Sequence, residues 1–152
     1  MPKTLITTIP FAERNKFPLE ILEANNISHT INPFNKKLVE DQLIELLSDG
    51  FDSIIAGTEP ITRKVLESSQ SIKHISRVGI GLDSVDLIAA KELGIEVSYT
   101  PDAPAPAVAE LTIGLMLSLL RGIHISNFDL HKGIWKRHFG RRIPEITIGI
   151  IG

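Results

Sequence analysis

The strongest constraint on the fold is a regular alternation of short apolar runs and segments with helical periodicity over the first 99 residues. The apolar runs lie at residues 5–9, 27–31, 51–56, 74–78 and 95–98, and the helical segments between them at residues 18–25, 38–47, 62–67 and 84–93. Strands separated by helices favour a parallel sheet, because a parallel connection has to cross back over the sheet. Right-handed crossovers therefore predict a doubly wound, flavodoxin-like or Rossmann-like α/β domain with helices on both faces of the sheet.

A proline-rich connector at residues 100–106 marks a change in organisation, and we place a domain boundary between residues 99 and 100. Residues 107–121 follow as a helix that is apolar on all sides, so it needs cover over most of its surface. Residues 146–151 are predicted to form a buried strand, and Gly152 stands where a phosphate-binding turn would begin. Residues 100–152 are therefore predicted to be the connector, long helix and first strand of a truncated nucleotide-binding domain.

Composition excludes several classes of function. With 22% charged residues and a formal net charge of -2, the chain lacks the basic excess of a nucleic-acid or membrane-surface protein. It has no cysteine, which fits a reducing, cytoplasmic compartment, and its longest apolar stretch, residues 111–120, is too short to span a bilayer. The 5 histidines show no spacing typical of metal ligands, so no metal site is predicted.

The strongest candidate site lies at residues 76–86, where the fourth predicted strand runs into two closely spaced glycines. Ligands of parallel α/β sheets bind at the carboxyl ends of the strands, so Arg77 and the backbone amides of Val78 and Gly79 are predicted to bind a carboxylate or phosphate. A plain tight turn with a solvated arginine remains the alternative. Asp83 is expected to cap the following helix, with Asp86 completing a capping pair.

A second candidate follows the third predicted strand, at residues 57–60. Thr58 in this segment is predicted to be a turn or N-cap residue rather than a ligand contact.

Several motifs in this order resemble the D-isomer-specific 2-hydroxyacid dehydrogenase family, in its phosphoglycerate dehydrogenase-like branch. These motifs are Gly79-Ile80-Gly81-Leu82-Asp83-Ser84-Val85-Asp86, Thr100-Pro101, Ala107-Val108-Ala109-Glu110, Gly133-Ile134-Trp135 and Thr147-Ile148-Gly149-Ile150-Ile151-Gly152. The resemblance implies two similar α/β domains with a cleft between them, the first domain being interrupted by the second. It also implies NAD (or NADP) as cofactor, a small 2-hydroxy or 2-oxo acid such as 3-phosphoglycerate as substrate, and a homo-oligomer such as a dimer.

The resemblance also assigns roles to residues. The Val78 and Gly79 amides would hold the substrate carboxylate, and Arg77 its anionic end. Ile80, Val108 and Gly152 would contact the cofactor, with Gly152 as the first glycine of the dinucleotide fingerprint. The family's catalytic arginine, glutamate and histidine follow that fingerprint, so no catalytic residue is expected in this chain.

Two departures from the family pattern leave the substrate open. Pro104 and Tyr99 stand where asparagines are common in the family. A non-catalytic binding protein of the same fold, such as a transcriptional corepressor, remains the alternative function. A receiver-type signalling module is disfavoured, because it needs carboxylates after the first strand and at the end of the third, and those places read Thr7-Thr8-Ile9-Pro10 and Ile55-Ala56-Gly57-Thr58.

Overall fold

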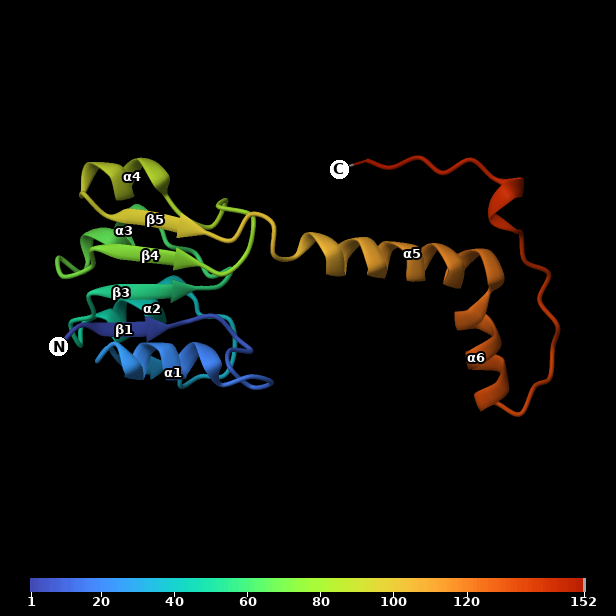
Figure 1. The fold of residues 1–152 in the computed structure, drawn as a ribbon, viewed down its shortest axis with the longest axis horizontal. Coiled ribbons are helices and arrows are strands. Elements are labelled where there is room, and N and C mark those ends of the chain that lie inside the picture. Colours follow the sequence, from blue (N-terminus) through green and yellow to red (C-terminus); the bar gives the residue numbers. More distant parts are fainter. Residues whose placement is uncertain (152) are drawn as a thin grey trace. The chain divides into compact units, whose positions relative to one another are not determined.

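Five parallel strands form the sheet of the computed structural model, which describes residues 1–151 (Figure 1). They are β1 (Lys3–Ile6), β2 (Ser28–Ile31), β3 (Ser53–Ala56), β4 (His74–Arg77) and β5 (Glu96–Tyr99), in the spatial order β2-β1-β3-β4-β5. The predicted doubly wound parallel sheet is confirmed. Its order reverses after β2, so the switch point of the topology lies between β1 and β3.

Four helices connect these strands, namely α1 (Phe17–Ala24), α2 (Glu40–Leu47), α3 (Arg63–Glu67) and α4 (Leu87–Glu92). Because the strand order reverses after β2, right-handed crossovers place α1 on one face and the other three helices on the opposite face. Consistent with this, α2 contacts α3 and α3 contacts α4, while α1 contacts β2 (Figure 1). Helices α2 and α3 are also linked by polar contacts, since Glu40 accepts hydrogen bonds from Thr62 and Lys64.

The hydrophobic core lies between the sheet and the layer of α2, α3 and α4. Strand side chains that point to this face alternate along the sequence, as the two-residue period of a strand requires. The fully or almost fully buried members are Leu5, Ile54, Ala56 and Ile75 from the strands and Leu43, Leu47, Val65, Leu66, Ala89 and Ala90 from the helices. The face towards α1 is more polar: Thr4 and Ser53 share a hydrogen bond of 2.6 Å, as do His74 and Ser98 at 2.9 Å.

Two local predictions about element ends are wrong. Strand β1 ends at Ile6 rather than at residue 9, because the Thr7 and Thr8 amides both donate to one carbonyl, that of Ile55, at 2.9 and 3.4 Å. The N-cap of α4 is Asp86 and not Asp83, since the Asp86 carboxylate accepts from the Ala89 amide at 2.8 Å. Capping depends on where the chain first turns helical, and here the chain does so three residues later than predicted.

The chain divides into two units, Met1–Ala103 and the residues from Pro104 onward. The second unit contains α5 (Ala105–Arg121), α6 (Ile123–His131) and a short 3₁₀ helix, Ile143–Glu145. Gly122 separates α5 from α6 with a φ of 61°, a left-handed conformation that glycine adopts at little cost. Helix α6 was not predicted, because its apolar residues, Ile123, Ile125, Phe128 and Leu130, do not gather on one side at a helical period.

The strand predicted at residues 146–151 is not formed. Ile146 has extended dihedral angles, but residues 146–151 pair with no strand within the described residues. A strand needs a neighbour that takes up its backbone donors and acceptors, and none is present there. Gly152, predicted as the first glycine of the cofactor fingerprint, lies outside the described residues.

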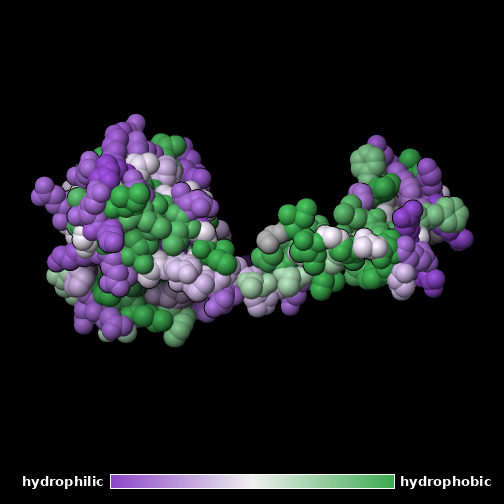
Figure 2. Space-filling view, turned by 90° about the horizontal axis from the view of Figure 1, so that it is seen from above, coloured by the Kyte–Doolittle hydropathy of each residue, from purple (hydrophilic) through white to green (hydrophobic). Residues whose placement is uncertain are grey.

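Helix α5 carries large exposed apolar side chains, and Figure 2 shows such apolar surface on one face of it. They include Val108, Leu111, Ile113, Leu115 and Leu119, and no residue of α5 is buried. No single helix within residues 1–151 is long and apolar enough to cross a membrane, although α5 and α6 together, bent by 65°, reach that length and composition. Apolar surface of this extent requires a partner surface in a folded protein.

Candidate functional site

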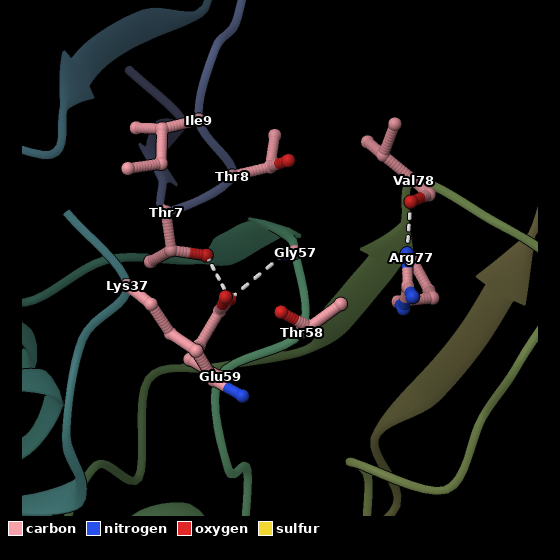
Figure 3. Close-up of a pocket in the computed structure, with 9 residues that line it drawn as sticks. All are labelled: Thr7, Thr8, Ile9, Lys37, Gly57, Thr58, Glu59, Arg77 and Val78. Atoms are coloured by element: carbon pink, nitrogen blue, oxygen red, sulfur yellow. Dashed lines mark hydrogen bonds between the residues drawn. The ribbon is translucent and has the colours of Figure 1, made fainter. Parts of the chain in front are cut away.

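A pocket of about 200 Å³ opens at the carboxyl ends of β1, β3 and β4 (Figure 3). This is the sheet edge at which open parallel α/β folds bind ligands, next to the switch point. The segment after β2 contributes the cationic side chain of Lys37. The complete lining is Thr7, Thr8, Ile9, Lys37, Gly57, Thr58, Glu59, Arg77 and Val78.

One wall of this pocket is held by a buried carboxylate, that of Glu59, whose residue is 2% exposed. Its Oε1 accepts hydrogen bonds from the Thr7 hydroxyl and from the Gly57 amide, the latter at 2.9 Å (Figure 3). Thr7 follows β1 and Gly57 follows β3, so the carboxylate ties two strand ends together. Residue 57 has to be glycine here, because a Cβ would come within 2.8 Å of Glu59 Oε2 and 3.0 Å of Thr8 Cα.

Opposite this wall, the last residue of β4 supplies a buried cation. Arg77 is 8% exposed, and its side chain folds back so that Nη1 donates to the carbonyl of Val78 (Figure 3). Its Nε is buried without a hydrogen-bond partner, and within residues 1–151 no carboxylate forms an ion pair with it. A buried guanidinium with an unused donor is costly, so the arrangement fits an anion that completes its hydrogen bonds.

The turn after β4 requires glycine for two reasons. Gly79 has a φ of +142°, which side-chain-bearing residues rarely adopt, and a Cβ there would lie 2.4 Å from Arg77 Nη1. The turn thus leaves room for the guanidinium beside it.

The two amides predicted to hold a carboxylate are already bonded in this structure. Val78 N donates to the Ala56 carbonyl at 2.9 Å, and Gly79 N donates to the Thr100 hydroxyl at 2.8 Å. The hydrogen bond of Val78 N continues the pairing of β3 and β4, so we expect it to be kept when a ligand binds. A carboxylate oxygen could reach the Gly79 amide if it took the place of the Thr100 hydroxyl, which requires a rotation of one exposed side chain.

The predicted cofactor contacts belong to different parts of the chain. Ile80, in the loop after β4, is 60% exposed, and Val108, on α5 in the second unit, is 58% exposed. Both offer apolar surface that no described residue covers.

Arg77, Val78 and Thr58, which were named from the sequence, all line the pocket. Glu59 stood in the second candidate segment, residues 57–60, without a role of its own, and Thr7 and Lys37 were missed. Thr58 lies in a bend after β3, and the N-cap of α3 is Thr62, whose hydroxyl accepts from Val65 N at 3.4 Å. The available signal for Lys37 was its position between a predicted strand and the next predicted helix. Thr7 gave no such signal, because it lay inside the strand predicted at residues 5–9, whereas β1 ends at Ile6.

Metal ligation finds no support in the part of the chain that the structure describes. Residues 1–151 contain no group of three or more histidine, aspartate or glutamate side chains placed to share an ion. His138, for example, pairs instead with Asp129 at 3.0 Å within the second unit.

Comparison with known proteins agrees with this geometry. The family described as D-isomer specific 2-hydroxyacid dehydrogenase, catalytic domain, matches residues 12–142. A hydroxypyruvate reductase of Thermotoga maritima is 36% identical over 120 residues, which is 78% of this chain and 39% of that protein. A D-3-phosphoglycerate dehydrogenase of Methanocaldococcus jannaschii is 38% identical over 117 residues, covering 76% of this chain and 22% of that protein.

Solved structures give the same result. The NAD⁺-bound 3-phosphoglycerate dehydrogenase of Entamoeba histolytica superposes with a TM-score of 0.74 at 29% identity, over 93% of this chain and 43% of that one. The D-lactate dehydrogenase of Escherichia coli reaches a TM-score of 0.74 at 25% identity, over 93% of this chain and 44% of that one. The chain thus spans less than half the length of these relatives. Since most of its residues match the family and its glycine-rich turn follows β4 in a parallel sheet, the chain belongs to the D-isomer specific 2-hydroxyacid dehydrogenase family.

Proposed function

We propose that the full-length protein carrying this chain is an oxidoreductase that interconverts a small D-2-hydroxy acid and its 2-oxo acid, with NAD or NADP as cofactor. The observation that carries the proposal is the buried, incompletely bonded guanidinium of Arg77 beside a strand-end pocket. A pocket of about 200 Å³ suits an acid of a few carbon atoms. The family and the names of its relatives support the reaction class.

Within this proposal the residues of this chain bind and orient the substrate. Arg77 makes charge-assisted hydrogen bonds to the substrate's anionic group, and Gly79 N replaces its bond to Thr100 by one to a carboxylate oxygen. No histidine lines the pocket among the described residues. We therefore expect the acid/base group that takes the hydroxyl proton to come from a part of the protein outside this chain.

The nicotinamide supplies hydride chemistry when it is bound. Ile80 fits a contact with an apolar ring face, because its exposed side chain stands in the loop beside the pocket turn. Val108 is proposed as a cofactor contact from the family resemblance of its motif alone. The described residues provide no phosphate cradle, since residues 146–151 form no strand. Gly152 is proposed as a cofactor contact from the sequence motif alone.

Two substrate pairs follow from the relatives, namely 3-phosphoglycerate with its 2-oxo acid, and D-glycerate with hydroxypyruvate. Measuring NADH or NADPH oxidation by the full-length protein with a panel of 2-oxo acids tests the function. Turnover of at least one of them is expected. An absence of turnover with every member and both cofactors would reject the proposal and favour a binding protein of the same fold.

A further inference from the structure

The carboxylate of Glu59 is buried in the pocket wall without a cationic partner. Its residue is 2% exposed and lines the pocket, yet within residues 1–151 no lysine or arginine forms an ion pair with it. Burying an ionised carboxylate is costly unless hydrogen bonds or charges compensate it. The substrate contacts proposed above involve Arg77 and Gly79 and leave the Glu59 carboxylate unused.

The two oxygens of this carboxylate differ in their bonding. Oε1 accepts both available hydrogen bonds, from the Thr7 hydroxyl and the Gly57 amide. Oε2 lies over Gly57, where a Cβ would come within 2.8 Å of it, and accepts no hydrogen bond from the described residues. An ionised carboxylate has about four acceptor positions, so acceptor capacity is left beside the pocket.

The fold holds the Glu59 carboxylate, and with it Oε2, in place. Strand ends β1 and β3 fix Oε1, and the segment that follows is anchored where Ile61 N donates to the Ser84 carbonyl at 2.7 Å and Asp86 N donates to the Ile61 carbonyl at 2.9 Å. The hydrogen bonds to Oε1 therefore hold the Glu59 side chain, and backbone hydrogen bonds of Ile61, two residues later, hold its segment against the loop before α4. A preorganised acceptor of this kind binds a donor without having to be ordered first.

We propose that Glu59 Oε2 accepts a hydrogen bond from a hydroxyl group on the carbon next to C2 of the substrate. The site then recognises a 2-hydroxy acid at two points, the anionic group at Arg77 and a free hydroxyl at Glu59. This inference rests on the proposed function and deepens it. It selects D-glycerate and hydroxypyruvate over 3-phosphoglycerate, because a phosphate ester at that carbon has no hydrogen to donate and brings negative charge towards a carboxylate.

The decisive comparison uses two acids that differ by this hydroxyl alone. The full-length protein should oxidise D-glycerate with a kcat/KM at least about 100-fold above that for D-lactate, because a site built to bond a hydroxyl rejects the analogue that lacks it. 3-Phosphoglycerate should also be the poorer substrate. Equal kcat/KM values for D-glycerate and D-lactate would overturn the inference without needing any variant.

The variant Glu59→Gln separates recognition from structural support. A glutamine carbonyl can still accept from Thr7 and Gly57, but a donor NH₂ group replaces the free oxygen. The preference for D-glycerate, measured as the ratio of the two kcat/KM values, should fall to about tenfold or less. A purely structural role would lower both activities together and leave their ratio unchanged, which would also overturn the inference. Glu45→Gln, the same change at an exposed position of α2, serves as the matched control and should keep the wild-type ratio.

A failure of the proposed function is distinguishable from a failure of this inference. If the full-length protein turns over no 2-hydroxy acid, the reaction class is rejected, and the two acids are then compared by calorimetric binding to wild type and Glu59→Gln. Tighter binding of D-glycerate that is lost in the variant would support the acceptor site. Equal affinities would overturn it.

Discussion

Replacing Arg77 by methionine should make the first unit more stable while it removes anion binding. Arg77 is 8% exposed, and among residues 1–151 its Nε has no hydrogen-bond partner and its guanidinium donates one hydrogen bond, to the Val78 carbonyl. Losing that bond costs about 1 kcal/mol. Replacing a buried, uncompensated ionic group by an apolar one of similar length is often stabilising by about 1–4 kcal/mol. The expected net gain in the free energy of unfolding is therefore about 0–3 kcal/mol, with a midpoint of about 1.5 kcal/mol.

Urea denaturation of the chain, followed by circular dichroism, measures this change directly. Each kcal/mol gained should also raise the melting temperature of a unit of about 100 residues by roughly 5 °C. Arg63→Met is the matched control: Arg63 lies at the surface, paired with Glu92 at 2.8 Å, and its removal should change stability by less than about 1 kcal/mol. A loss of more than about 1 kcal/mol in Arg77→Met would refute the reasoning, because it would mean that the guanidinium stabilises the fold as it stands.

The same substitution should weaken anion binding and catalytic efficiency, although it stabilises the fold. Oxalate or phosphate should raise the unfolding midpoint of wild type and not that of Arg77→Met, since a ligand that binds only the folded state stabilises it. In the full-length protein the same variant should lose roughly 10- to 100-fold in kcat/KM, the value of one charge-assisted contact. An unchanged kcat/KM would show that Arg77 does not meet the substrate.

Four further outcomes are expected. Gly79→Ala should destabilise the first unit by about 1–3 kcal/mol in urea denaturation, because of its φ of +142° and its clash with Arg77; an unchanged midpoint would contradict this. The Thr62 hydroxyl, together with Lys64, holds the pKa of Glu40 below its ordinary value of 4.5. The ionised Glu40 therefore stabilises the fold above pH 4.5, and this contribution is lost as the pH falls through the lowered pKa. Glu40→Gln should flatten the dependence of the free energy of unfolding on pH in that acid range. The exposed apolar surface of α5 should make the chain self-associate, and Leu115→Gln should weaken this in light scattering; a monomeric wild type at all concentrations would contradict it. Calorimetry should detect no NAD binding by the 152-residue chain alone, because a dinucleotide site needs three glycines and a helix N-terminus after its strand.

The fold of the first unit could be predicted because the local spacing of apolar residues indicates each strand and helix. Alternating strand and helix patterns lead to a parallel sheet, and chain handedness leads to helices on both faces. Element ends were less accurate: Asp83 and Asp86 are equally good capping residues, and the sequence does not say at which of them the helix begins. The strand predicted at residues 146–151 failed for another reason, since strand formation depends on a neighbour and not on apolar composition alone.

The sequence by itself determined where ligand-binding groups would gather. The glycine-rich turn after β4 and the arginine before it are neighbours along the chain, so their relation can be read from the residues. The role of Glu59 could not be read in that way. Its hydrogen-bond partner Thr7 lies 52 residues away, and the two meet only because β1 pairs with β3 in a particular register. Tertiary structure alone decided that this carboxylate is buried, that one of its oxygens is saturated, and that the other is left beside the pocket, since burial and hydrogen-bond partners depend on residues distant in sequence.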